Sequence, residues 1–188
     1  GRAMWEYEPK LDRFGTPMAL MLLPYFTDGC IGSMEGLYFE ASSTTPFHFL
    51  NQSELSSQPS RAQRDMPYSA LDVTEGVSHL QMLGVKYYLA TSDAAIAAAR
   101  ADDRLTELTS ITPAPTSDGV QHQWVVFEVA EADLVTPLRC EPVVLTDTDD
   151  HIDGWVYAKE RSAPAPGQGQ RTTATRPAWW GWALRSFG

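Results

Sequence analysis

The chain has 188 residues, of which 43% are hydrophobic and 20% charged, and this balance is typical of one globular domain, with or without a tail, rather than of a disordered chain. The formal net charge is −10, the pI is about 4.7 and no basic stripe is present, which argues against nucleic acid and anionic membrane surfaces as partners. The longest apolar run, residues 18–26, is shorter than the roughly 20 residues that cross a bilayer.

The first part of the chain predicts one short helix and one long irregular segment. Thr16 is a suitable N-cap, Pro17 suits the first helical position, and Pro24 is expected to end the helix. Residues 26–56 have neither a helical nor a strand period, although residues 46–50, PFHFL, could form a helical turn or a strand. Irregular segments of this length are uncommon in compact domains and often functional.

From residue 72 onward the pattern becomes regular. Val73, Val77, Leu80 and Leu83 share one helical face, and Gly84 occupies the C′ position. A second helix is expected after Ser92, which is a good N-cap ahead of an alanine-rich run. Enrichment in β-branched and aromatic residues between turn signals predicts four strands, at Val85–Ala90, Leu105–Ile111, Gln123–Val129 and Glu141–Thr146, the last centred on Val143–Leu145.

These elements predict an α/β or α+β domain, in which a mixed sheet is covered by helices and carries a long ordered N-terminal loop region. We expect this domain to occupy residues 1–160. Residues 161–188 are rich in Pro, Gly, Ala and Thr and then carry three tryptophans at 179, 180 and 182. Such a composition indicates a flexible linker followed by a Trp-rich segment that packs onto the core or anchors at a membrane interface.

Carboxylates and aromatic residues alternate in and around the long loop, which is the composition of a sugar-binding site. Aromatic faces stack on sugar C–H surfaces, while acids accept hydroxyl hydrogen bonds and, in pairs, can hydrolyse glycosides. A structural loop whose carboxylates accept backbone N–H groups is the competing interpretation. The candidate ligand-binding residues are Trp5, Glu6, Glu8, Glu35, Tyr38, Glu40, Phe47 and His48.

Other chemistry has weaker support in the sequence. The four histidines lack metal-binding spacings, and the acidic run at residues 147–153 lacks the glycine and glutamate of an EF-hand, so no metal is expected. The absence of GxSxG, GxGxxG and P-loop motifs argues against a nucleophile elbow and a nucleotide cofactor. Cys30 and Cys140 are the only cysteines, and their spacing leaves a disulfide and two reduced thiols equally open.

Several stretches resemble a known family. GRAMWEYEPKLDRFGTPMALMLLPY, GSMEGLYFEASSTTPFHFLNQSELS and LQMLGVKYYLATS resemble the extracytoplasmic portion of actinobacterial multi-pass membrane proteins described as 6-pyruvoyl-tetrahydropterin synthase-related. Those proteins look like C-type glycosyltransferases that use polyprenol-phosphate sugars, and GVKYY with WVVFEV and PVVL also resembles YfhO-like membrane proteins. The likeness covers most of residues 1–146. No residue here matches the acid of C-type enzymes or the zinc histidines of the pterin synthase, so no catalytic residue, metal or cofactor is assigned.

The resemblance implies a piece of a longer protein, lying outside the cytoplasmic membrane and attached to transmembrane helices of the same chain. In that setting Cys30 and Cys140 are expected to be close and bonded. The implied function is non-catalytic binding or positioning of a glycan or polyprenol-linked sugar during cell-envelope assembly. A stand-alone glycan hydrolase using the loop carboxylates is the alternative, and a protein-interaction module is a further one.

Overall fold

The structure is a computed structural model that describes residues 1–12, 15–35, 45–64, 66–113 and 119–135. These residues belong to one compact unit, Gly1–Thr136. The predicted strand Glu141–Thr146 and the predicted boundary near residue 160 lie outside the described residues, and so does the Trp-rich segment.

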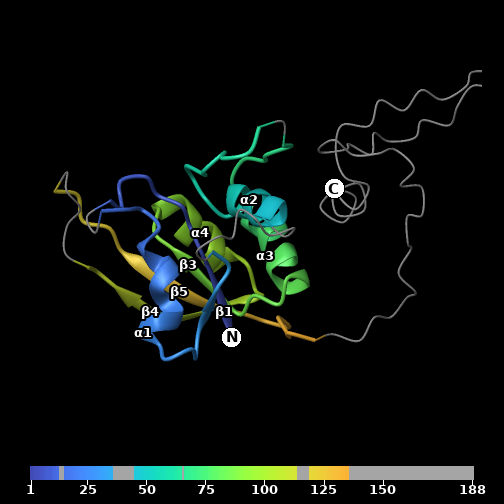
Figure 1. Cartoon of the computed structure of the whole chain (residues 1–188). Coiled ribbons are helices and arrows are strands. Elements are labelled where there is room, and N and C mark those ends of the chain that lie inside the picture. Colours follow the sequence, from blue (N-terminus) through green and yellow to red (C-terminus); the bar gives the residue numbers. More distant parts are fainter. Residues whose placement is uncertain (13–14, 36–44, 65, 114–118, 136–188) are drawn as a thin grey trace, which may run out of the picture. The chain divides into compact units, whose positions relative to one another are not determined.

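A five-stranded mixed sheet forms the centre of this unit (Figure 1). Its strand order is β2-β1-β3-β5-β4. The strands are β1 (Arg2–Trp5), β2 (Gly32–Ser33), β3 (Tyr87–Ala90), β4 (Leu105–Ile111) and β5 (Trp124–Val129). Strand β1 runs parallel to β2 and β3, whereas β5 is antiparallel to both β3 and β4. The predicted mixed sheet with helices packed on it is therefore confirmed.

The sequence predicts three of these five strands and misses two, β1 and the two-residue strand β2. Strands β3, β4 and β5 lie within or coincide with the predicted ranges. Strand β1 was not expected, because Ala3, Met4 and Trp5 are consecutive buried residues. A strand covered on both faces loses the alternation by which a half-exposed strand is recognised.

Helices α3 (Val73–Met82) and α4 (Asp93–Ala101) begin at side-chain caps. Asp72 Oδ1 accepts a hydrogen bond from Glu75 N–H at 3.1 Å, and Ser92 Oγ accepts one from Ala95 N–H at 3.2 Å. Helix α3 ends before Gly84, whose φ of +62° is the left-handed conformation that favours glycine at C′. Both helices are thus set by local signals that the sequence makes visible.

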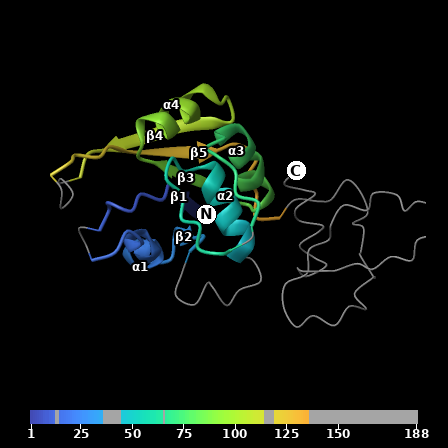
Figure 2. The ribbon, with the colours of Figure 1, turned by 90° about the horizontal axis from the view of Figure 1, so that it is seen from above.

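The hydrophobic core lies between α3, α4 and one face of the sheet, while α1 lies beside the edge strand β2 (Figure 2). Strands β3 and β5 contribute alternate residues to this core, so that Tyr88 stacks on Phe127 with ring centroids 6.2 Å apart. Helix α3 contributes the apolar face that its sequence period predicts. The helical core residues are Val73, Val77, Leu80, Ala95, Ile96 and Ala99.

The N-terminal helix differs from the prediction in its start and in the role of its proline. A 3₁₀ turn, η1 (Ala19–Leu22), leads into the short helix α1 (Leu23–Phe26). Thr16 Oγ1 accepts a hydrogen bond from Met18 N–H at 3.1 Å and so closes a turn instead of capping a helix. Pro24 lies in the first turn of α1 instead of ending a helix. Backbone N–H groups in the first turn make no hydrogen bond within the helix, so proline, which has no N–H, is tolerated there.

Part of the segment predicted to be irregular is regular. Residues 26–56 contain strand β2 and helix α2 (Thr45–Glu54), which confirms and extends the helical alternative for PFHFL. Nine of the ten α2 residues are buried, and most of them are polar. A helix buried on all sides with polar contacts has no apolar stripe, so its sequence lacks the period that marks a surface helix.

The C-terminal end of α2 presses against α3 at Gly76. A Cβ added at Gly76 would lie 2.6 Å from Leu55 Cδ2 and 2.8 Å from Leu55 Cγ. Leu55 is fully buried, so it has little room to move away. Helix α3 therefore carries glycine here because the two helices approach too closely for a methyl group.

Gly76→Ala is expected to lower the free energy of unfolding by about 1–3 kcal/mol through overpacking. At an uncrowded helix position the same change would instead raise this free energy by up to ~1 kcal/mol, because alanine favours the helix more than glycine does. Urea denaturation of the variant measures the change. The Gly76→Ala, Leu55→Ala double variant is expected to lose less than the sum of the single losses, because the shortened side chain makes room for the methyl group. A Gly76→Ala protein more stable than the parent would contradict this account of the helix contact.

Candidate functional site

The predicted sugar-binding residues are distributed over several elements. Trp5 is the last residue of β1 and is 1% exposed, so its ring presents no face to a ligand in this structure. Phe47, in α2, is partly exposed. Tyr38 and Glu40 lie outside the described residues. The remaining four, Glu6, Glu8, Glu35 and His48, are buried and take part in three separate sets of contacts.

Glu6 binds backbone N–H groups from two distant segments. Its Oε2 accepts hydrogen bonds from Thr91 N–H and Ser92 N–H, each at 2.8 Å. Its Oε1 accepts one from Ser57 N–H at 3.1 Å. The carboxylate thereby fixes the start of α4 and the chain that follows α2 to the end of β1. Because Glu6 is 1% exposed, it is a buried structural anchor.

Tyr88 adds a neighbouring contact to this anchor. Its hydroxyl donates a hydrogen bond to Leu55 O at 2.6 Å, just before the segment that Glu6 binds. Burial, followed by the negative charge of Glu6, raises the pKa of Tyr88 well above its usual value. Tyr88 is thus held as a neutral hydrogen-bond donor and is not a proton acceptor for chemistry near neutral pH.

Glu8 has a local role. Its Oε1 accepts a hydrogen bond from Lys10 N–H at 3.0 Å, two residues further along the chain. A carboxylate that accepts from the backbone two residues on closes a turn, which is a common structural use of an acidic side chain. Glu8 therefore shapes the segment after β1 instead of joining Glu6 in a pair of acids.

Glu35 and His48 form a buried carboxylate–imidazole pair. His48 Nε2 lies 2.5 Å from Glu35 Oε1, and Gln52 Nε2 donates to the same oxygen at 2.8 Å. Both members of the pair are at most 2% exposed. His48 and Gln52 are one turn apart on α2, so together they attach this helix to the segment after β2. The structure brings together these two of the predicted site residues.

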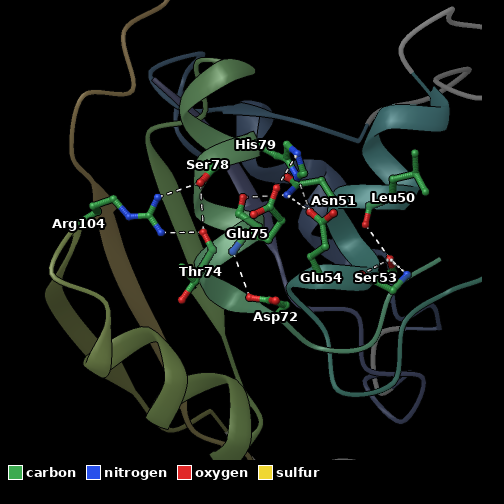
Figure 3. Close-up of polar contacts among 12 residues, drawn as sticks. Leu50, Asn51, Ser53, Glu54, Asp72, Thr74, Glu75, Ser78, His79 and Arg104 are labelled. Carbon is green, nitrogen blue, oxygen red and sulfur yellow. Dashed lines mark hydrogen bonds and ion pairs between the residues drawn. The ribbon is translucent and has the colours of Figure 1, made fainter. Parts of the chain in front are cut away.

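A second carboxylate–imidazole pair joins α2 to α3 (Figure 3). His79 Nδ1 lies 2.7 Å from Glu54 Oε2, and its Nε2 lies 3.6 Å from Glu75 Oε1, one turn earlier on α3. Asn51 Nδ2 donates to Gly76 O at 2.9 Å and to Glu54 Oε2 at 3.2 Å. The two helices are therefore linked by a small network of polar groups, of which all but Glu75 are buried.

The sequence did not reveal this network, because its members are 25 residues apart along the chain and share no motif. The available signal is the run of four polar residues at 51–54, which directly follows the more apolar stretch PFHFL. Asn51 also begins the triplet NQS, but its amide is fully buried and hydrogen-bonded, so it is not an accessible glycosylation site.

Arg104 makes a further set of contacts on the outer side of α3 (Figure 3). Its guanidinium donates to Asp102, to Ser78 Oγ at 2.9 Å and to Thr74 O at 2.6 Å. The hydrogen bond from Arg104 lowers the pKa of Asp102 below its ordinary value. This contact fixes the turn between α4 and β4 against α3, away from the acids of the predicted groove.

Exposed aromatic faces occur on α1, where the sequence did not place them. Tyr25 is 77% exposed and Phe26 74% exposed, and their rings pack edge to face with centroids 5.2 Å apart. Leu22 precedes them and is also exposed. Large apolar groups gathered on a surface in this way are a common feature of binding sites.

Cys30 is exposed shortly after α1, and Cys140 lies outside the described residues, so their pairing stays a prediction. The described residues do not gather three or more metal-ligating side chains in one place. Within the same part of the chain, every helix is too short or too polar to span a bilayer.

The described unit is a mixed α/β domain whose buried acids and histidines bind one another and the backbone. In acyl-transfer enzymes a carboxylate orients a histidine so that its other ring nitrogen faces a nucleophile. Here Nε2 of His79 faces a second carboxylate, and both histidines are buried, so the arrangement fits structural hydrogen bonding better than general base catalysis.

Comparison with protein-family models, curated proteins and solved structures finds no match for this chain.

Proposed function

We propose that this chain is a non-catalytic extracytoplasmic domain of a membrane glycosyltransferase-like protein, which binds or positions a glycan or polyprenol-linked sugar in cell-envelope assembly. The sequence resemblance suggests the setting. The chemistry of the described residues supports the binding role over hydrolysis, for two reasons that concern the acids and the exposed aromatic rings.

The use made of the acids is the observation that carries the proposal. A glycoside hydrolase needs two carboxyl groups that face the scissile bond. Glu6 and Glu8 instead accept backbone N–H groups, and Glu35 is buried against His48. Protonating or moving Glu6 or Glu35 would disturb the fold, and Glu8 is occupied in a local turn, so the three are poorly suited to an acid/base cycle.

The exposed pair Tyr25 and Phe26 supplies the stacking faces that Trp5 does not. An edge-to-face pair leaves ring surface free to cover the C–H face of a sugar, and the Tyr25 hydroxyl can hydrogen-bond a sugar hydroxyl. One such surface gives weak binding, in the range of roughly millimolar to micromolar Kd. Attachment to a membrane by another part of the chain would raise the local concentration and make weak binding sufficient.

Titration of the full chain with a panel of soluble pyranose and furanose disaccharides, followed by NMR, tests the binding role. We expect saturable shifts at α1, and we expect Tyr25→Ala or Phe26→Ala to raise Kd about fivefold each, the equivalent of ~1 kcal/mol per stacking ring. Leu108→Ala, which shortens an exposed apolar side chain on β4, is the matched control and should leave Kd unchanged.

Incubation of the same chain with p-nitrophenyl glycosides separates binding from hydrolysis. The proposal expects no release of nitrophenol above the uncatalysed rate. Steady turnover that is abolished by Glu35→Gln would instead favour the hydrolase. Binding to none of the sugars would leave the protein-interaction module as the better description of this domain.

A further inference from the structure

The two edges of the sheet differ in how they are protected. At one end β2 contains only two residues, Gly32 and Ser33. At the other end β4 contains seven residues, and all of them except Leu105 are exposed. A sheet edge presents unpaired backbone N–H and C=O groups, and very short edge strands are one way to limit pairing with other chains. Strand β4 lacks this protection.

Strand β4 also lacks the side chains that usually block an edge. The stretch LTELTSI contains no proline, lysine or arginine. Its single charge, Glu107, is paired with Arg100 of α4, with Arg100 Nε 2.8 Å from Glu107 Oε2. Leu108 and Ile111 are exposed along the same strand. The edge is therefore locally neutral and partly apolar, which favours addition of another strand.

The chain itself turns away from this edge after β5. Gln81 Nε2, on α3, donates to Ala130 O at 2.8 Å. Next, residues 133 and 134 pass Gly84, where an added Cβ would lie 2.8 Å from Asp133 O and 3.5 Å from Arg2 Nη2. The described residues that follow β5 thus run toward β3 and β1 and away from β4 (Figure 1).

A β-bulge in β4 makes a second copy of this chain the best-matched partner. Glu107 pairs with Phe127 and Thr109 with Val126, so Leu108 is an extra residue. Ala130 N–H donates a hydrogen bond to Arg104 O, so the backbone N–H and C=O groups of residues 104 and 106 point toward β5. The backbone groups of residues 105 and 107 therefore point outward, away from the sheet. After the bulge the alternation shifts, so the next outward-facing residue is Ser110.

We propose that β4 is a self-pairing edge, at which two copies of the chain join antiparallel about a two-fold axis into one continuous sheet. The outward-facing residues Glu107 and Ser110 are three apart instead of the regular two. A second strand with the same bulge has the same three-residue spacing, so both outward-facing residues of each copy find a partner. A regular strand has a two-residue spacing, so it can stay in register with only one of them. With the axis between Leu108 and Thr109, Glu107 lies opposite Ser110 of the partner, and no like charges face each other.

Sedimentation velocity of the full chain over a wide concentration range measures this association. We expect a monomer–dimer equilibrium that strengthens as salt is raised, because each copy has a net charge of −10 and salt screens the repulsion. Leu108→Lys and Ser110→Pro are each expected to raise the dimer Kd at least about tenfold, since they introduce an edge charge and remove an outward N–H. Leu108→Lys lowers the net negative charge, so repulsion alone would predict the opposite result.

Two controls make the test specific. Leu22→Lys introduces the same charge at another exposed leucine, and Ser110→Ala keeps the backbone N–H, so both should leave the dimer Kd within about twofold. A chain that stays monomeric at all concentrations and salt levels would overturn the proposal. A dimer that is broken by Leu22→Lys but not by Leu108→Lys would overturn it as well, because the interface would then lie at α1. These results are independent of sugar binding.

Discussion

Replacing Glu6 with glutamine is expected to lower the free energy of unfolding by about 2–4 kcal/mol, the largest effect of any single conservative change at the predicted site. The carboxylate accepts three backbone hydrogen bonds, from Ser57, Thr91 and Ser92. Glutamine has one accepting oxygen, and its NH₂ group would face N–H donors. At least one buried donor would lose its partner, and the remaining bonds would lose the assistance of the negative charge. Urea denaturation near neutral pH measures the change.

The matched control for this prediction is Glu8→Gln, which alters one local hydrogen bond in a turn. We expect it to cost less than ~1 kcal/mol. The sign of the Glu6 effect also distinguishes its two possible roles. Residues poised for ligand binding or catalysis often cost stability, so replacing them is neutral or stabilising. A Glu6→Gln protein at least as stable as the parent would therefore contradict the structural role of Glu6 and favour a role in binding or catalysis.

The elements that the sequence predicts correctly are those whose signals are local. Helices α3 and α4 carry their own caps, Asp72 and Ser92, and each has an apolar face whose period can be counted. Strands β3 and β5 alternate between the core and the other face of the sheet. An element packed on one side has a periodic pattern of apolar residues, and capping residues occur at fixed positions relative to the helix ends. Both patterns can be recognised in the sequence.

The elements that the sequence misses are buried on more than one side. Strand β1 is covered on both faces, and the polar residues of α2 have partners elsewhere in the fold. Their hydrogen bonds connect residues far apart in sequence, such as Glu6 with Thr91, which are 85 positions apart. Composition drew attention to the acids near the N-terminus as candidates for sugar binding. It could not separate an acid that binds sugar from one that binds backbone, because both uses require the same side chain.

Breaking the pair between Glu54 and His79 is expected to have the second large effect. His79→Ala leaves a buried carboxylate without its closest partner, and Glu54→Ala leaves the buried imidazole and the Asn51 amide without theirs. Each single change should lower the free energy of unfolding by about 3–5 kcal/mol, the usual cost of an uncompensated buried charge. Urea denaturation of the two variants measures these losses against the parent chain.

The double variant Glu54→Leu, His79→Leu provides the decisive comparison. It removes both polar groups and refills the space, so it should recover much of the stability that either single alanine variant loses, as replaced buried ion pairs often do. The exposed pair Lys86 and Glu128 is the control, and Lys86→Ala should leave the unfolding midpoint unchanged within error. The coupling between the two side chains is measured with the Glu54→Ala, His79→Ala double variant, and additive losses there would show that they act independently. A large coupling would show that helices α2 and α3 are fixed to each other by a single polar unit, and that this unit, rather than an apolar stripe, determines where the polar helix α2 lies in the fold.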